Sequence, residues 1–317
     1  MSVPNGSHPG GSVPRDRRAV LAGMLALLSA GPLTGAGPLP AGRYGPFGAP
    51  EPLGTLAGRR APAVPAVPGD SRAPGVSDIP GVPDAPDVPV GLWPDGATVV
   101  RGRHSVVVGH RVPHAALRDL AATADRARRT VAEIWGPVRA LVLHPATDAE
   151  AAALAGAGST HGLAALATAD RVIVLPSGYA RLTATGRDVV ITHELTHVAT
   201  GATRGGRVPM WLSEGFADYA GYRDAGIAVR TVAAELAAEV RAGTLPARLP
   251  VPADFAPGAP RLAQAYEEAW LACRLVAERF GEKALVRLYG SDVGSTLGLS
   301  AAEFTRAWRE YLRRELR

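Results

Sequence analysis

The stretch that decides the fold is residues 186–219, GRDVVITHELTHVATGATRGGRVPMWLSEGFADY. It contains His193-Glu194-Leu195-Thr196-His197, in which two histidines stand four positions apart. On a helix such residues share one face with Cβ atoms about 5–6 Å apart, so both imidazoles can reach one Zn²⁺ at about 2.0–2.1 Å. Glu194 lies beside them and can take a proton from water at the metal. The pattern therefore predicts a zinc site with Glu194 as its general base.

A second helix is expected to begin at Pro209. It contains WLSEGFA at 211–217, which places Glu214 17 positions after His197. These residues resemble the gluzincin zinc metallopeptidases, above all the aminopeptidase and leukotriene-hydrolase branch, although the spacing here is a little shorter. The resemblance implies a zincin-like metallopeptidase domain in which His193, His197 and Glu214 hold the metal. It is specific in these motifs and only general over the rest of the domain.

Asp218 stands one helical turn beyond Glu214 on the same face. From there it can accept the free ring N–H of a ligand histidine and fix that ring's tautomer, as metal-bound histidines usually require. The resemblance supports this role, since thermolysin-like relatives carry an Asp at the same step. The alternative is a surface acid that makes an ordinary local ion pair.

Tyr266 stands near the start of a long amphipathic helix that opens at Ala265 and continues through Phe280 to Gly281. In the aminopeptidase branch a tyrosine near the start of a comparable helix donates a hydrogen bond to the oxyanion. The resemblance therefore implies a catalytic role for Tyr266, because a phenol at this place stabilises charge that exists only in the transition state. A packed core aromatic is the alternative. Tyr219 and Tyr179 are weaker candidates for the same role.

Short apolar runs come before the metal motif, and helical patterns follow it. Helices are predicted at 114–135 and 148–155. Strands are predicted at 98–100, 105–108, 139–144, 162–168 and 171–175. From Gly186 onward almost everything is predicted to be helical, so the fold class is α+β, a small mixed sheet followed by a mainly helical half. Gluzincins pair an edge strand with the extended substrate, and the resemblance gives this role to the 162–175 pair without deciding which strand is the edge.

The remaining histidines and the lone cysteine carry no metal pattern. Five further histidines lack ligand spacing among themselves and are expected at the surface or in caps: His104, His110, His114, His144 and His161. Cys273 has apolar neighbours at helical spacing and is expected to be a buried thiol. A single cysteine also excludes an internal disulfide.

The N-terminal third differs in composition from the rest. Residues 1–37 are predicted to be an export signal or an N-terminal anchor, because Arg17-Arg18 precedes an apolar run at 19–30 that is shorter than the about 20 residues of a membrane span. The arginine pair resembles a twin-arginine signal. Residues 38–95 are rich in Pro, Gly and Ala and are predicted to be a disordered linker. An uncleaved 19–30 segment would tether the chain to a membrane, so a secreted or cell-surface location is expected.

Residues 96–317 are predicted to be the zinc metallopeptidase domain, with one Zn²⁺ and a peptide or protein substrate. Its basic residues are scattered among acids without interleaved aromatics, so no nucleic-acid partner is expected although the net charge is +5. The Gly-x-Met-Glu-Asn motif of aminopeptidases is absent, so exopeptidase specificity is not carried over. Two alternatives remain: a zinc-containing domain that binds peptides without cleaving them, and a surface-tethered interaction protein that acts through its Pro-rich arm.

Overall fold

The computed structural model describes residues 91–157, 160, 162–205 and 208–317. The predicted export segment, the 19–30 tether and most of the predicted linker lie outside these residues. The predicted secreted or cell-surface location depends on the same segments and stays a prediction. His161 lies outside them too. Within the described part of the chain, none of the helices combines the length and apolar character that crossing a bilayer requires.

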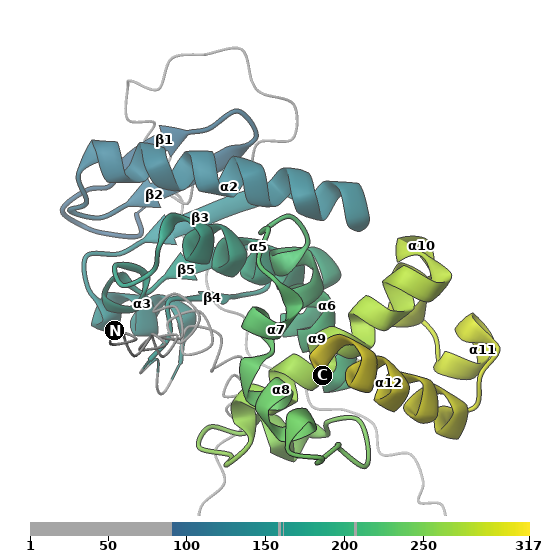
Figure 1. Cartoon of the computed structure of the whole chain (residues 1–317). Coiled ribbons are helices and arrows are strands. Elements are labelled where there is room, and N and C mark those ends of the chain that lie inside the picture. The colour runs from purple at the N-terminus through teal and green to yellow at the C-terminus, as the bar shows by residue number, and fades with distance from the viewer. Residues whose placement is uncertain (1–90, 158–159, 161, 206–207) are drawn as a thin grey trace, which may run out of the picture. The chain divides into compact units, whose positions relative to one another are not determined.

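Five short strands form one mixed sheet (Figure 1). They are β1 (Thr98–Arg101), β2 (Ser105–Gly109), β3 (Ala140–His144), β4 (Ala165–Ala167) and β5 (Val172–Val174). The spatial order is β1-β2-β3-β5-β4, with β2, β3 and β5 parallel and the two outer strands antiparallel to their neighbours. The last strand pair is shorter than the predicted 162–168 and 171–175, and β4 is the member that lies at the edge.

The sheet is covered on both faces. Alternate residues of its strands point to opposite sides, and each side packs in its own apolar cluster. Residues of one parity, Val107, Val142, Val172 and Val174, join a large apolar cluster with side chains of α2 (His114–Ile134) and α5 (Ala184–Thr200). Those of the other parity, Val106, Leu141, Leu143 and Ile173, pack in a smaller cluster with α3 (Asp148–Ala155). This burial explains why β3, β4 and β5 consist, apart from His144, of Val, Leu, Ile and Ala.

The second half of the domain is helical. After α4 (Pro176–Tyr179) and α5, it contains the helices α6 (Met210–Tyr222), α7 (Val229–Val232), α8 (Ala234–Arg241), α9 (Leu262–Phe280), α10 (Glu282–Tyr289), α11 (Val293–Leu297) and α12 (Ala301–Leu316). Two 3₁₀ turns, Ala202–Arg204 and Pro252–Phe255, lie between them. The predicted α+β class, with the sheet first and the helices second, is confirmed. Buried α9 packs against α6, and α5 lies between α6 and the sheet (Figure 1).

The folded part begins before residue 96. Trp93, which falls in the predicted linker, is 8% exposed and packs in the smaller apolar cluster. Its ring stacks on His110 with 5.1 Å between centroids. Asp95 contacts the same imidazole, with 2.9 Å between Oδ1 and Nε2. Residues 91–95 are therefore attached to the sheet rather than to the linker.

His110 is buried, between two carboxyl groups, so the expectation that it lies at the surface or in a cap was wrong. Its Nδ1 lies 2.8 Å from Oε2 of Glu150, while Nε2 faces Asp95. A neutral imidazole has one N–H, so both ring nitrogens can donate to carboxylates only when the ring is charged. The hydrogen bond with Glu150 is the main reason that the pKa of His110 is raised above 6.5. Hydrogen bonds from Arg111 and then His110 lower the pKa of Asp95 to about 2.

We expect His110 to make stability depend on pH. Because its pKa is raised in the folded chain, the contribution of the imidazolium is complete below the ordinary pKa of about 6.5 and is lost as pH rises through the folded-state value. The stability gap between the natural chain and His110→Phe should therefore be larger at about pH 5.5 than at about pH 9.5, as measured by urea unfolding.

Arg111→Gln is the matched control for this prediction. Arg111 Nε donates to Asp95 at 3.0 Å without touching the imidazole, and its guanidinium keeps its charge across this range. Its stability gap should not shrink as pH rises. An equal gap for His110→Phe at both pH values would show that the charged imidazole does not hold this segment.

Candidate metal centre

The two motif histidines lie on α5 and face the interior. His193 and His197 are 0% and 1% exposed, and their Nε2 atoms are 3.0 Å apart. Thr183 begins the helix by accepting a hydrogen bond from Gly186 N, and Gly201, at φ 69°, ends it in the left-handed region that favours glycine. The predicted shared helical face is therefore present, and the two Nε2 atoms converge.

Glu214 reaches the same point from α6. Its Oε2 lies 3.6 Å from Nε2 of His193 and 3.6 Å from Nε2 of His197. Pro209 precedes the first turn of α6, so the chain enters this helix with a fixed φ angle. The ligand atoms of the three residues all lie within 4.8 Å of one another, and all three residues are buried. These three residues, called the metal-ligand group below, can hold a metal ion.

The charges around this point fit a cation. Oε2 of Glu214 is buried and has no hydrogen-bond partner among the described residues. The carboxyl groups of Glu194 and Asp218 are buried beside it, yet no Lys or Arg in the described ranges forms an ion pair with any of the three. Buried carboxylate oxygens without a balancing positive charge are costly, so a positive ion between these groups would satisfy them.

Asp218 contacts His193 as the spacing on α6 predicts. Its Oδ1 lies 2.9 Å from Nδ1 of His193. A hydrogen on Nδ1 leaves the lone pair on Nε2, the nitrogen that faces His197 and Glu214. Burial lowers the pKa of His193 to about 3, which keeps the ring neutral as a metal ligand must be.

Glu194 is buried next to His193 without being one of the three convergent ligands. Burial, together with the charge of Glu214, raises the pKa of its carboxyl well above 4.5. The backbone of Ala167 on β4 acts in the opposite direction through a hydrogen bond. Glu194 thus lies between the metal-ligand group and the edge strand, with Oε2 unpartnered among the described residues.

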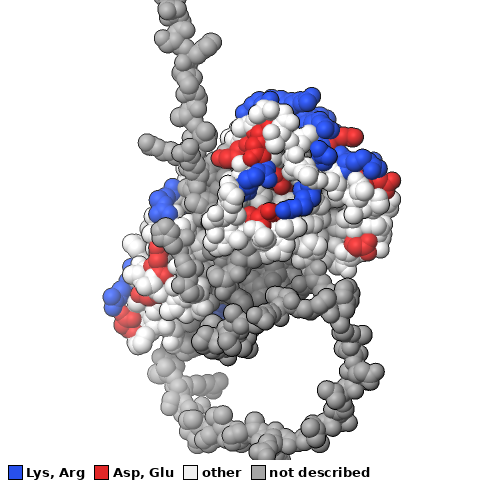
Figure 2. All heavy atoms as spheres, turned by 90° about the horizontal axis from the view of Figure 1, so that it is seen from below, with Lys and Arg blue, Asp and Glu red and all other residues white. Residues whose placement is uncertain are grey.

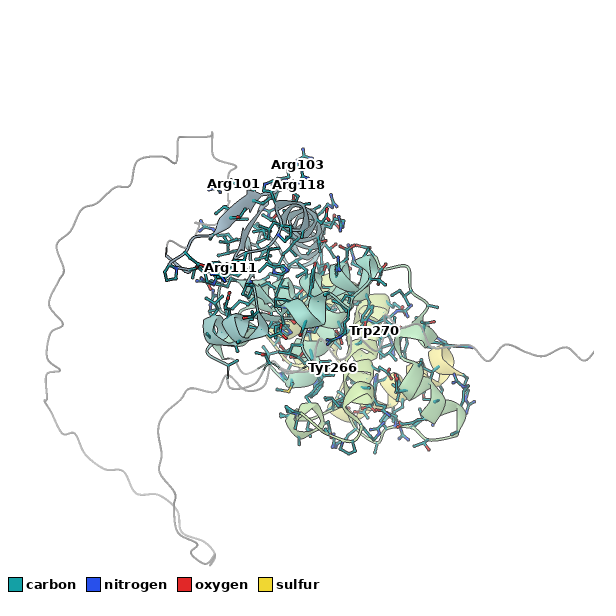
Figure 3. All side chains as sticks on the ribbon, turned by 90° about the vertical axis from the view of Figure 1, so that its left-hand side faces the viewer. Arg101, Arg103, Arg111, Arg118, Tyr266 and Trp270 are labelled. Carbon is teal, nitrogen blue, oxygen red and sulfur yellow. The ribbon has the colours of Figure 1, made fainter. Side chains whose placement is uncertain are left out.

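Tyr266 extends from the first turns of α9 into the interior of the helical half (Figure 3). It is 2% exposed, and its ring meets Phe255 edge-on at 5.2 Å between centroids. Burial is the main cause that raises its pKa well above 10, followed by the charges of Glu214, Asp218 and Glu194. Its hydroxyl therefore belongs to the same electrostatic environment as the metal-ligand group.

The other two tyrosines are engaged elsewhere. Tyr219 Oη donates to Oε1 of Glu282 at 2.7 Å. Tyr179 lies beneath the guanidinium of Arg187, which is 5.1 Å from the ring centroid. Of the three tyrosines, only Tyr266 has a pKa that the charges of Glu214, Asp218 and Glu194 raise.

Gly215 has a role that sequence analysis missed, although it stands inside the quoted motif. A Cβ at this position would lie 2.3 Å from Ala269 O and 2.9 Å from Cys273 Sγ. The missing side chain therefore lets α6 approach α9 closely, directly beside Glu214. Cys273 is buried, as expected, and its Sγ contacts Leu212 O at 3.9 Å.

Comparison with known proteins gives no match: no family model matches the chain, and no curated protein matches it in sequence. The interpretation of the site therefore depends on its own geometry. The two imidazoles and the three carboxyl groups lie on α5 and α6, and every one of these groups is buried, as is the Tyr266 phenol on α9.

Gly215→Ala should destabilise the domain and weaken metal binding. The added methyl group meets a backbone carbonyl that cannot move alone, and overpacking of this kind costs about 1–3 kcal/mol. Separation of α6 from α9 would also move Glu214. We would measure the free energy of unfolding and the zinc affinity by chelator competition.

Gly290→Ala is the matched control, because a Cβ there meets nothing closer than Arg287 O at 3.9 Å. It should leave both quantities near those of the natural chain. If Gly215→Ala also left zinc affinity unchanged, the close approach of α6 and α9 would not position the ligand.

Proposed function

We propose that this protein is a zinc-dependent peptidase with a zincin-like catalytic domain. The observation that carries the proposal is the convergence of two imidazole nitrogens and one carboxylate oxygen on one buried point, with a further carboxyl, Glu194, left over beside them. Structural zinc sites are closed by four protein ligands, whereas catalytic sites have three and keep one position open. A spare buried acid at such a point suits proton transfer instead.

Zinc suits this ligand set. Two histidines and one glutamate are the ligands of one class of catalytic zinc sites, which keep a fourth position for water or substrate. With bonds of about 2.0–2.1 Å, tetrahedral ligand atoms are roughly 3.3 Å apart, and the three distances here are 3.0, 3.6 and 3.6 Å. His193, His197 and Glu214 would therefore hold one Zn²⁺.

Glu194 is the proposed general base. Zinc bound here would supply a Lewis acid that polarises the scissile carbonyl and makes water more acidic. The Glu194 carboxylate accepts a proton from the attacking water while the oxygen of that water forms a bond to the carbonyl carbon. When the C–N bond breaks, the same carboxyl donates that proton to the leaving nitrogen, so the base is regenerated.

The edge strand β4 is the proposed place for the substrate backbone. Thr168 N donates to Arg171 O and Leu175 N donates to Ala164 O, which turns the even-numbered residues of β4 toward β5. The backbone groups of Ala165 therefore point to the outer side of the sheet. An extended peptide could pair there regardless of its side chains, beside the Glu194 carboxyl that Ala167 contacts.

The proposed substrates are peptides or proteins rather than anionic polymers. Basic and acidic side chains are interspersed on the face seen in Figure 2, a distribution that does not form the continuous basic stripe of a nucleic-acid surface. The alternative, a zinc domain that binds peptides without cleaving them, would give no role to Glu194. A separate alternative is that the protein acts through its Pro-rich arm, most of which lies outside the described residues.

Glu194→Gln should abolish hydrolysis while zinc stays bound. The amide keeps the shape of the side chain but cannot accept the proton, so the rate should fall by about 10²–10⁴-fold. We would incubate the full chain with a mixed peptide library and locate every cut by mass spectrometry, with a chelator as a second control.

Glu268→Gln is the matched variant, since Glu268 is a buried acid on α9 that pairs with Arg261 instead of the metal-ligand group. It should retain cleavage. Full activity of Glu194→Gln would contradict the mechanism. Absence of cleavage by the folded, zinc-loaded natural chain would favour the peptide-binding alternative.

Tyr266→Phe should lower kcat with little change in KM. The phenol would donate to the oxyanion only in the transition state, and loss of one such donor costs about 10²–10³-fold. Steady-state kinetics on a peptide identified by the library would test this. Tyr179→Phe serves as the control, and an equal fall in kcat for both variants would make Tyr266 a packing residue.

A further inference from the structure

The short helix α10 lies along α6 and contacts it at both ends. At its first residue, Oε1 of Glu282 accepts from Tyr219 Oη at 2.7 Å and from Arg223 Nε at 2.9 Å. At its last residue, Tyr289 Oη lies 3.3 Å from Ser213 Oγ. The two helices are therefore fastened near both ends of α6, and Ser213 is the residue directly before the ligand Glu214.

The Tyr289 hydroxyl also reaches the end of α5. It donates to Thr200 Oγ1 at 3.1 Å, and the Thr200 hydroxyl donates to the carbonyl of His197 at 3.4 Å. With Ser213 Oγ as donor to Tyr289, the three hydroxyls form one continuous chain in which each donates once. The chain starts beside Glu214 and ends on the backbone of the ligand His197.

An aromatic cluster holds the Tyr289 ring in place. Its centroid lies 5.2 Å from that of Trp135, at the end of α2, and 5.6 Å from that of Phe216 on α6. Trp135 and Phe216 are themselves 5.6 Å apart. Edge contacts at these distances restrict ring orientation, and Tyr289 is 8% exposed. The hydroxyl therefore has a defined direction toward α5 and α6.

We propose that Tyr289 is a positioning residue that sets the spacing between the two metal-bearing helices. The inference depends on the proposed metal site but not on peptide hydrolysis. Residues 201–209 separate α5 from α6 in the sequence, and a segment of this length does not fix the distance between the helices by itself. The hydroxyl chain from Ser213 to His197 links the two helices at the level of the ligands.

Tyr289→Phe keeps the ring and removes the link. In the full chain it should weaken zinc binding roughly tenfold, as loss of groups that orient metal ligands does. Two measurements are needed: zinc affinity by chelator competition, and the d–d absorption of the cobalt(II)-loaded protein, which reports ligand geometry. Both should change. Adding Thr200→Val should weaken binding little further, because the two changes break the same chain.

Tyr311→Phe is the matched control, since Tyr311 is a buried tyrosine of α12 that is 1% exposed. It should alter thermal stability but leave zinc affinity and the cobalt spectrum unchanged. If Tyr289→Phe fails to fold, Ser213→Ala, at a partly exposed position, should still weaken zinc binding. Natural affinity and an unchanged cobalt spectrum in whichever of these variants folds would overturn the proposal.

The natural chain is measured first, so that the two hypotheses fail separately. If it binds no zinc, the metal site itself is wrong. If it binds zinc but does not cleave peptides, the proposed peptidase activity is wrong, while the comparison of Tyr289→Phe with Tyr311→Phe still decides the role of Tyr289.

Discussion

Three carboxyl groups and two imidazoles share one buried region, and this concentration of negative charge governs the rest of the site. Glu194, Glu214 and Asp218 are each 5% exposed or less. Burial and then the charge of Glu214 raise the pKa values of Glu194 and Asp218 well above normal, so without a cation these groups hold protons more readily. Metal binding would release those protons, so ion affinity, pH and folding are coupled here.

The same region is enclosed by unusually close helix contacts. α6 carries Glu214 and Asp218 on one face and Gly215 on another, where the backbone of α9 passes. α9 in turn carries Tyr266, whose pKa is raised by burial and then by the charges of these carboxyl groups. α6 therefore carries Glu214 and Asp218 and packs against the helix that carries Tyr266, so a shift of α6 would disturb all three side chains.

The sequence was informative where function depends on short spacing. His193, His197, Glu214 and Asp218 lie within 26 residues. Helical periodicity predicts that the two histidines share one helix face and that the two acids share another, and the resemblance to gluzincins implied that these faces meet. It failed for contacts between distant segments. Tyr289 meets Ser213 and Thr200 across 76 and 89 positions, and no local pattern marks it. His110 was misjudged because its partners Asp95 and Glu150 come from other elements, and the edge position of β4 follows from sheet order, which local patterns do not encode.

The attachment of Trp93 to the sheet moves the practical start of the folded unit. A chain cut at residue 96 would lose the indole that stacks on His110 and covers part of the smaller apolar cluster. It would also leave the imidazole with one carboxylate instead of two. The smallest piece that can be expected to fold as the whole protein does therefore starts at or before residue 91, ahead of this indole.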